Sequence, residues 1–154
     1  MAMPFLEHVS TRRVEARPFL KWAGGKASLI NQFAQLFPQE VDRYIEPFVG
    51  GGAVFFHLKH GFPRMRAFLR DSNKELINCY RIVRDRPIEL MRWLDHYERS
   101  FRSHGSDYYY LIRRQHDLTD DLARAARTIF LNKTCSNGHF GLTLAANSTR
   151  QSVK

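Results

Sequence analysis

The sequence has few cysteines, a shortage of acidic residues and no long apolar run. Its 154 residues include two cysteines, Cys79 and Cys135. They are too few for a disulfide scaffold and lack metal-ligand spacing, so we expect no metal. No stretch approaches the roughly 20 apolar residues of a membrane span, and the N-terminus lacks the apolar core of a signal peptide. These absences predict a cytoplasmic protein with reduced cysteines and no membrane-spanning segment.

Basic residues outnumber acidic ones by 24 to 15, which gives a net charge of +9. Nucleic acid is the commonest partner of so basic a protein, although positive charge also keeps a protein soluble by self-repulsion. The composition, 44% hydrophobic and 25% charged, is typical of a soluble globular protein. The length favours one domain with a substantial core, and we expect a monomer.

A glycine-rich stretch is the most informative part of the chain. Residues 44–56, YIEPFVGGGAVFF, read as a β-strand, three glycines and the start of a helix. Glycine has no Cβ, so Gly50, Gly51 and Gly52 can take positive φ and bring peptide N–H groups close to a ligand. A strand, glycine turn and helix also place nucleotide-like ligands at the carboxyl end of an α/β sheet. Taken alone, the same glycines fit an ordinary tight turn.

Two flanking segments support a ligand site. Residues 17–26, RPFLKWAGGK, combine two cations, an indole and a Gly-Gly turn. Residues 67–76, AFLRDSNKEL, form a short apolar strand that ends in Asp71. This acidic residue follows the glycine turn by about 20 residues, where a dinucleotide-type site places the carboxylate that accepts hydrogen bonds from ribose hydroxyls.

In this order and spacing, the three segments resemble the Dam-type AdoMet-dependent DNA adenine-N6 methyltransferases. FLKWAGGK and EPFVGGG are similar to that family's opening motifs, and LNKTCSNG, residues 131–138, is similar to a later one. The resemblance covers residues 17–139. It implies S-adenosyl-L-methionine (AdoMet) as cofactor, double-stranded DNA as partner, and methyl transfer to adenine N6 at a short specific site.

The resemblance also implies a cofactor site made of five residues. Trp22 and Lys26 are expected at the methionine end of AdoMet, with Lys26 pairing with the carboxylate. Gly50 and Gly52 let the backbone approach the cofactor, and Asp71 is expected at the ribose.

Each of these roles has a structural alternative. Trp22 could be a core tryptophan, and Lys26 a solvated lysine at a helix start. Asp71 could cap a helix that starts at Ser72, since Asp is a favoured cap. A phosphate-binding loop built on Lys26 is excluded, because Ala27 follows it where the Walker pattern needs Ser or Thr.

The implied fold class is α/β, namely an incomplete Rossmann-like AdoMet-dependent methyltransferase domain with a helical target-recognition insert. The hydrophobic pattern predicts four short helices in succession between residues 75 and 131, which fits such an insert and cannot form a βαβ sheet. Before them it predicts a helix, a strand, a helix and a strand, at residues 27–36, 41–48, 53–61 and 65–69. The expected divisions are a basic arm (1–16), the AdoMet-binding part (17–74), the helical target-recognition region (75–139) and a tail (140–154).

The resemblance implies DNA contacts at Lys21, Lys133 and Asn137. Ser136 stands where the family commonly has an aromatic residue, so a stacking or wedge surface is missing there. Arginines are dense between residues 81 and 127. We expect most of them on solvated helix faces and a subset at DNA phosphates, where they would position DNA without reading its sequence.

The tail departs from the family. Codons can be chosen for a family-like RVNSRGEFNTPVGK so that reading them one nucleotide late yields GLTLAANSTRQSV, the sequence of residues 141–153, followed by a codon beginning AA, which Lys154 satisfies. We therefore predict a frameshifted tail over residues 140–154; a naturally divergent tail is the alternative.

Adenine-N6 methylation in this family uses an Asp-Pro-Pro-Tyr group that receives the flipped base. That group does not occur in the sequence. We therefore expect no catalytic residue, an inactive chain, and an open apolar edge on an incomplete sheet. A non-enzymatic DNA-binding module derived from a methyltransferase is the alternative function.

Overall fold

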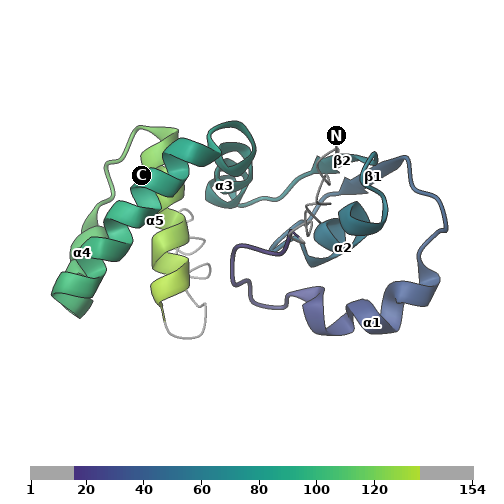
Figure 1. Cartoon of the computed structure of the whole chain (residues 1–154), viewed down its shortest axis with the longest axis horizontal. Helices are drawn as coiled ribbons and strands as arrows, with labels where there is room; N and C mark the ends of the chain where they lie inside the picture. The colour runs from purple at the N-terminus through teal and green to yellow at the C-terminus, as the bar shows by residue number, and fades with distance from the viewer. Residues whose placement is uncertain (1–15, 136–154) are drawn as a thin grey trace, which may run out of the picture.

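The computed structural model describes residues 16–135. Figure 1 shows two groups of elements along the chain. We call residues 16–73, which hold the β-strands, the sheet region, and residues 74–135, which hold the three longer helices, the helical region. Predictions on the arm, on Ser136, on Asn137 and on the tail fall outside the described residues.

The sheet region begins with an irregular helical stretch. It consists of η1 (Lys26–Leu29), α1 (Ile30–Phe33) and η2 (Ala34–Leu36) in place of the single regular helix predicted over 27–36. Of its predicted apolar face, Ile30 is buried, whereas Leu36 is 77% exposed. With little apolar packing and no side-chain cap at any of the three starts, the stretch tightens into 3₁₀ turns at both ends.

A βαβ unit follows, as predicted. It is formed by β1 (Arg43–Glu46), α2 (Ala53–Gly61) and β2 (Arg66–Leu69), and the strands pair in parallel with Ile45 opposite Phe68. Parallel sheets are normally covered on both faces. Here Ile45, Phe48 and Phe68 are 62%, 75% and 52% exposed. Within the described residues the α/β class is confirmed, and the sheet has two strands with exposed apolar side chains.

The helical region contains α3 (Lys74–Asp85), α4 (Pro87–Arg114) and α5 (Asp121–Thr134). The four predicted helical segments are present, and two of them, on either side of a kink at Gly105, together make up α4. Its backbone departs from helical geometry at Gly105, with φ 55° and ψ −133°. Glycine tolerates this conformation, so the chain bends there and helix continues on both sides.

The core is centred on α5, which lies beside both α3 and α4 (Figure 1). Leu131 and Ala125 on α5 have no exposed surface, and they join Leu76 of α3 and Tyr97 of α4 in one cluster. Arg127 is buried there as well. Its Nε donates to the Ile112 carbonyl at 2.9 Å and its Nη2 to the Arg113 carbonyl at 2.7 Å, which satisfies carbonyls at the end of α4.

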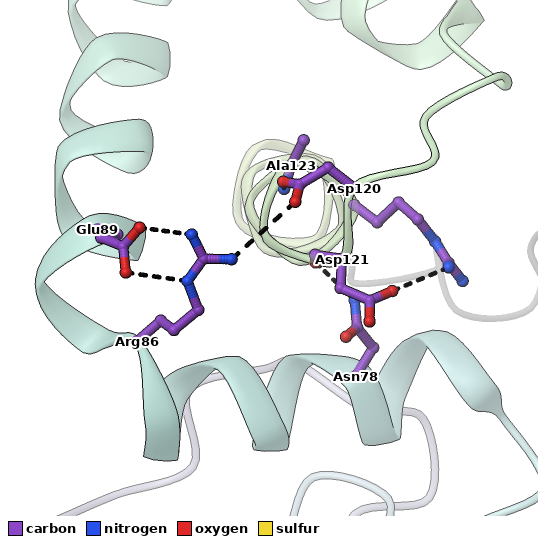
Figure 2. A network of polar contacts seen from close by, with 7 residues as sticks. Asn78, Arg86, Glu89, Asp120, Asp121 and Ala123 are labelled. Atoms are coloured by element: carbon purple, nitrogen blue, oxygen red, sulfur yellow. Dashed lines mark hydrogen bonds and ion pairs between the residues drawn. The ribbon is translucent and has the colours of Figure 1, made fainter.

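Polar contacts fix the start of α5 against the other two helices (Figure 2). Asp120 caps α5 by accepting from the Ala123 N–H at 2.8 Å, and it also faces the guanidinium of Arg86 at 4.0 Å. Asn78 of α3 donates through Nδ2 to the Asp121 carbonyl at 2.8 Å. These contacts fix the start of α5 within the helical region.

Candidate cofactor site at the glycine turn

The turn after β1 needs glycine at two positions. Gly50 and Gly52 have φ of 50° and 74°, the left-handed conformation that other residues adopt at a cost. The Gly52 N–H donates to the Val49 carbonyl at 2.8 Å, which closes the turn, and Gly52 is the N-cap residue of α2. No side chain caps α2, so its first N–H groups point toward the turn without a side-chain partner.

Space also demands glycine here. A Cβ on Gly50 would lie 2.9 Å from Cδ1 of Trp22, and one on Gly51 would lie 3.3 Å from the Trp22 Cβ. A Cβ on Gly52 would collide with the hydroxyl of Tyr80. The tryptophan therefore packs directly on the glycine turn.

Asp71 holds the turn against the start of α3. Its Oδ2 accepts from the Gly50 N–H and its Oδ1 from the Asn73 N–H, each at 3.0 Å. The cap of α3 is Asn73, whose Oδ1 accepts from the Leu76 N–H at 3.0 Å, and the helix begins at Lys74. The alternative that Asp71 caps a helix starting at Ser72 is therefore wrong. Because each carboxylate oxygen has a second lone pair, Asp71 keeps acceptor capacity for a ligand.

Glu46 is a site residue that the sequence reasoning did not select. It ends β1, is 8% exposed, and its Oε2 has no hydrogen-bond partner among the described residues. Burial raises the pKa of Glu46, against the opposing effects of a hydrogen bond with Tyr44 and of the Lys26 charge. An unpaired buried carboxylate oxygen is costly, and its position at the carboxyl end of a strand, in the EPFVGGG motif, is the signal that could have identified it.

These residues surround one cavity of about 210 Å³. All five predicted cofactor residues line it, together with Glu46. Trp22 is half-buried: it packs against the core and also lines the cavity. Lys26 is exposed at the start of η1 and at the rim of the cavity. The lining residues named by the sequence reasoning are Trp22, Lys26, Gly50, Gly52 and Asp71.

Two of the predicted DNA contacts are neighbours in space. Nζ of Lys21 lies 3.5 Å from the Lys133 carbonyl, and both lysine side chains are exposed. The side-chain amide of Asn132 accepts a hydrogen bond from the Lys21 N–H and donates one to the Lys21 carbonyl. The backbone at Lys21, just before the residues that line the cavity, therefore contacts the end of α5.

Five of the ten arginines between residues 81 and 127 form ion pairs with nearby acids. Arg99 lies 3.0 Å from Asp95, and its neighbours along α3, α4 and α5 form similar contacts. Their charge is therefore partly neutralised within the protein, which leaves fewer of them for phosphates than the sequence count suggests. The other contacts are Arg84–Asp85, Arg86–Glu89, Arg86–Asp120, Arg102–Glu98, Arg124–Glu75 and Arg124–Asp121.

Between residues 16 and 135, no cluster of three or more His, Cys, Asp and Glu side chains could hold a metal ion. In the same part of the chain, no helix is long and apolar enough to cross a membrane.

Comparison with known proteins adds a family match. Residues 22–151 match the family described as D12 class N6 adenine-specific DNA methyltransferase. The matched range contains the cavity and the helical region, and it extends into the tail.

Individual relatives agree with the family match. The chain is 38% identical over 138 residues to the type II methyltransferase M.MjaIII of Methanocaldococcus jannaschii, covering 81% of this chain and 48% of the relative. It is 37% identical over 127 residues to the DNA adenine methylase of Haemophilus influenzae, covering 82% and 43%. The DNA N-6-adenine-methyltransferase of Escherichia phage P1 is 39% identical over 125 residues, covering 79% and 16%. The chain thus spans less than half the length of these relatives.

Proposed function

Because the chain belongs to the D12 class of N6 adenine-specific DNA methyltransferases, we propose that the cavity at the glycine turn binds AdoMet. We further propose that the whole protein transfers the AdoMet methyl group to adenine N6 in double-stranded DNA. The observation that carries the cofactor assignment is Glu46: a buried carboxylate with an unpaired oxygen, in a cavity walled by glycine backbone.

The chemistry of the lining residues fits the parts of AdoMet. The methionine end of the cofactor carries an ammonium and a carboxylate. Glu46 would accept from the ammonium, which would satisfy its unpaired oxygen, and Lys26 would pair with the carboxylate. Asp71 would accept from the ribose hydroxyls through its remaining lone pairs. Trp22 would cover the cofactor with an apolar face, and Gly50 and Gly52 would admit it close to the backbone.

On the DNA side, we propose contacts from Lys21, Lys133 and Asn137. The two lysines would neutralise phosphates and so fix the position of the duplex without reading its sequence. The group that receives the adenine amine has to come from residues other than these, because no Asp-Pro-Pro-Tyr motif occurs in the sequence. Methyl transfer is therefore proposed for the whole protein, and this chain alone is expected to be inactive.

Calorimetric titration with AdoMet tests the cofactor assignment. We expect heat of binding for the wild type, loss of it in Asp71→Ala, and wild-type behaviour in Asp117→Ala, which changes an exposed loop acid away from the cavity. Unchanged binding in Asp71→Ala would contradict the assignment. Salt-sensitive DNA binding without any AdoMet heat would instead favour the alternative, a non-enzymatic DNA-binding module.

The tail is tested separately by sequencing the coding DNA through the codon of His139 and beyond. A shifted frame that continues with a family-like segment and an Asp-Pro-Pro-Tyr group would support the proposed frameshift over residues 140–154. Coding DNA whose other frames show no such continuation would support a naturally divergent tail.

A further inference from the structure

A buried amide joins the two ends of the described chain. Asn132, near the end of α5, is 2% exposed. Its Oδ1 accepts from the Lys21 N–H and its Nδ2 donates to the Lys21 carbonyl, both at 2.8 Å. One side chain thus satisfies both backbone groups of one residue, 111 positions away in the sequence.

The clamped residue begins the segment that lines the cavity. Leu20, just before Lys21, is buried in the core, and Trp22, just after it, packs on Gly50. The Trp22 carbonyl then accepts from the Gly25 N–H at 3.1 Å, which closes the turn that leads to Lys26. We call residues 21–26 the cofactor loop. Since this loop forms no helix or strand before Lys26, its backbone groups need partners such as Asn132 to hold one conformation.

We propose that Asn132 is a positioning residue for the cofactor loop, so that the end of α5 fixes Trp22 against the glycine turn. This proposal rests on the proposed AdoMet site for its functional meaning. Without the amide, the N–H and the carbonyl of Lys21, which bond to Asn132 in a part-buried setting, lose their partners, a loss that favours an open loop with water on those groups. Trp22 and Lys26 would then no longer be held in place before the cofactor binds, and ordering them would reduce the affinity.

The chain offers a matched control. Asn78 on α3 is also a buried asparagine, at 8% exposed, and it also makes a long-range bond, to the Asp121 carbonyl (Figure 2). That bond lies wholly within the helical region. If asparagine burial matters only for general stability, Asn78→Ala and Asn132→Ala should behave alike.

The test uses Trp22 as a reporter. The sequence has two tryptophans, so Trp93→Phe, at a partly exposed position of α4, leaves Trp22 as the one emitter. In this background we expect Asn132→Ala to shift the Trp22 emission to longer wavelength and to increase its quenching by acrylamide. We expect Asn78→Ala to leave both signals unchanged while lowering the melting temperature.

Calorimetry supplies the functional readout. Asn132→Ala is expected to weaken AdoMet binding about tenfold, the equivalent of about 1.4 kcal/mol, and Asn78→Ala to leave it unchanged. Absence of AdoMet binding in the wild type would contradict the proposed function, whereas the Trp22 signals would still decide the positioning role. Asn132→Asp is the second variant at this position. It keeps the shape of the side chain and the oxygen that accepts from the Lys21 N–H, but it loses the N–H that donates to the Lys21 carbonyl.

Equal Trp22 responses in Asn132→Ala and Asn78→Ala, or no response in either, would overturn the proposal. Loss of helical circular dichroism in both Asn132 variants would also overturn it, because the residue would then support the helical region itself.

Discussion

The two regions of the molecule differ in how completely they bury their apolar residues. Ten residues of α5 are buried, whereas β2 has no buried residue and alternates between exposed and half-buried positions. The helical region closes a core around α5. The sheet region exposes Ile45, Phe48 and Phe68 on and beside its strands. The contrast indicates that the helical region carries the stability of the described chain and that the sheet has room for further partners.

The candidate site lies where the two regions meet. The sheet region provides the glycine turn, Glu46 and Asp71, while α3 provides Tyr80, whose hydroxyl donates to the Gly50 carbonyl at 3.1 Å. Burial raises the pKa of Tyr80, so this hydroxyl stays protonated as a donor. The marginal sheet therefore receives its fixed geometry from the well-packed helices.

The largest effect is expected from truncating the helical core. Leu131→Ala should lower the free energy of unfolding by about 2–5 kcal/mol, because Leu131 is fully buried. Ile45→Ala also shortens an aliphatic side chain to alanine, but at an exposed strand position, so it should change the free energy of unfolding by less than about 1 kcal/mol. Urea denaturation of both variants measures the difference. Equal losses would mean that the sheet is covered as well as the helices are.

A second effect is expected at the bend of α4. Gly105→Ala should cost about 1–3 kcal/mol, because φ 55° and ψ −133° strain any residue with a Cβ. Gly61→Ala is the control in the sheet region: it lies at the end of α2 without positive φ, and a Cβ there meets no atom within 4 Å. Thermal unfolding of both variants tests the prediction. A stabilised Gly105→Ala would show that α4 prefers to be straight.

A smaller, pH-dependent effect is expected at Glu46. Burial raises its pKa above the usual value near 4.5, so the folded state binds its proton more tightly than the unfolded state. Wild-type stability should therefore fall as the pH rises from about 4.5 through the raised pKa. Glu46→Gln should be more stable than wild type at pH 7 and lose this advantage at lower pH. Urea titrations across the pH range measure it, and a constant difference would contradict the assignment.

The smallest effect is expected at the exposed ion pairs of α4. Arg102 and Glu98 form one such pair, four residues apart on the solvent side. Arg102→Ala should change stability by about 0.5 kcal/mol or less, and less still in high salt. A double-mutant cycle with Glu98→Ala isolates the pair. A coupling well above that range would mean that surface charge contributes to the helical region as much as single core contacts do.

Local features of the fold were predictable from the sequence, and long-range ones were not. The glycines, the start of α2 and the position of Asp71 follow from a local strand, turn and helix pattern. Glu46 belongs to the local EPFVGGG motif, but its burial beside a cavity that residues 22–26 also line is a long-range feature. The hydrogen bonds between Asn132 and Lys21 join residues near opposite ends of the described chain, and the hydrophobic pattern of the sequence does not predict such long-range pairs. The bend at Gly105 has no clear signal in the sequence, because a single glycine can either interrupt a helix or bend it.

Hydrogen–deuterium exchange with and without AdoMet tests the central claim most directly, namely that stable helices hold a cofactor site formed by a marginal sheet. We expect α5 amides to exchange slowly in both conditions. We expect residues 22–26, 49–52 and 71–73 to exchange faster than α5 without AdoMet and to become more protected when AdoMet is added. Protection that appears nowhere in these segments, or only in α4 and α5, would contradict the account.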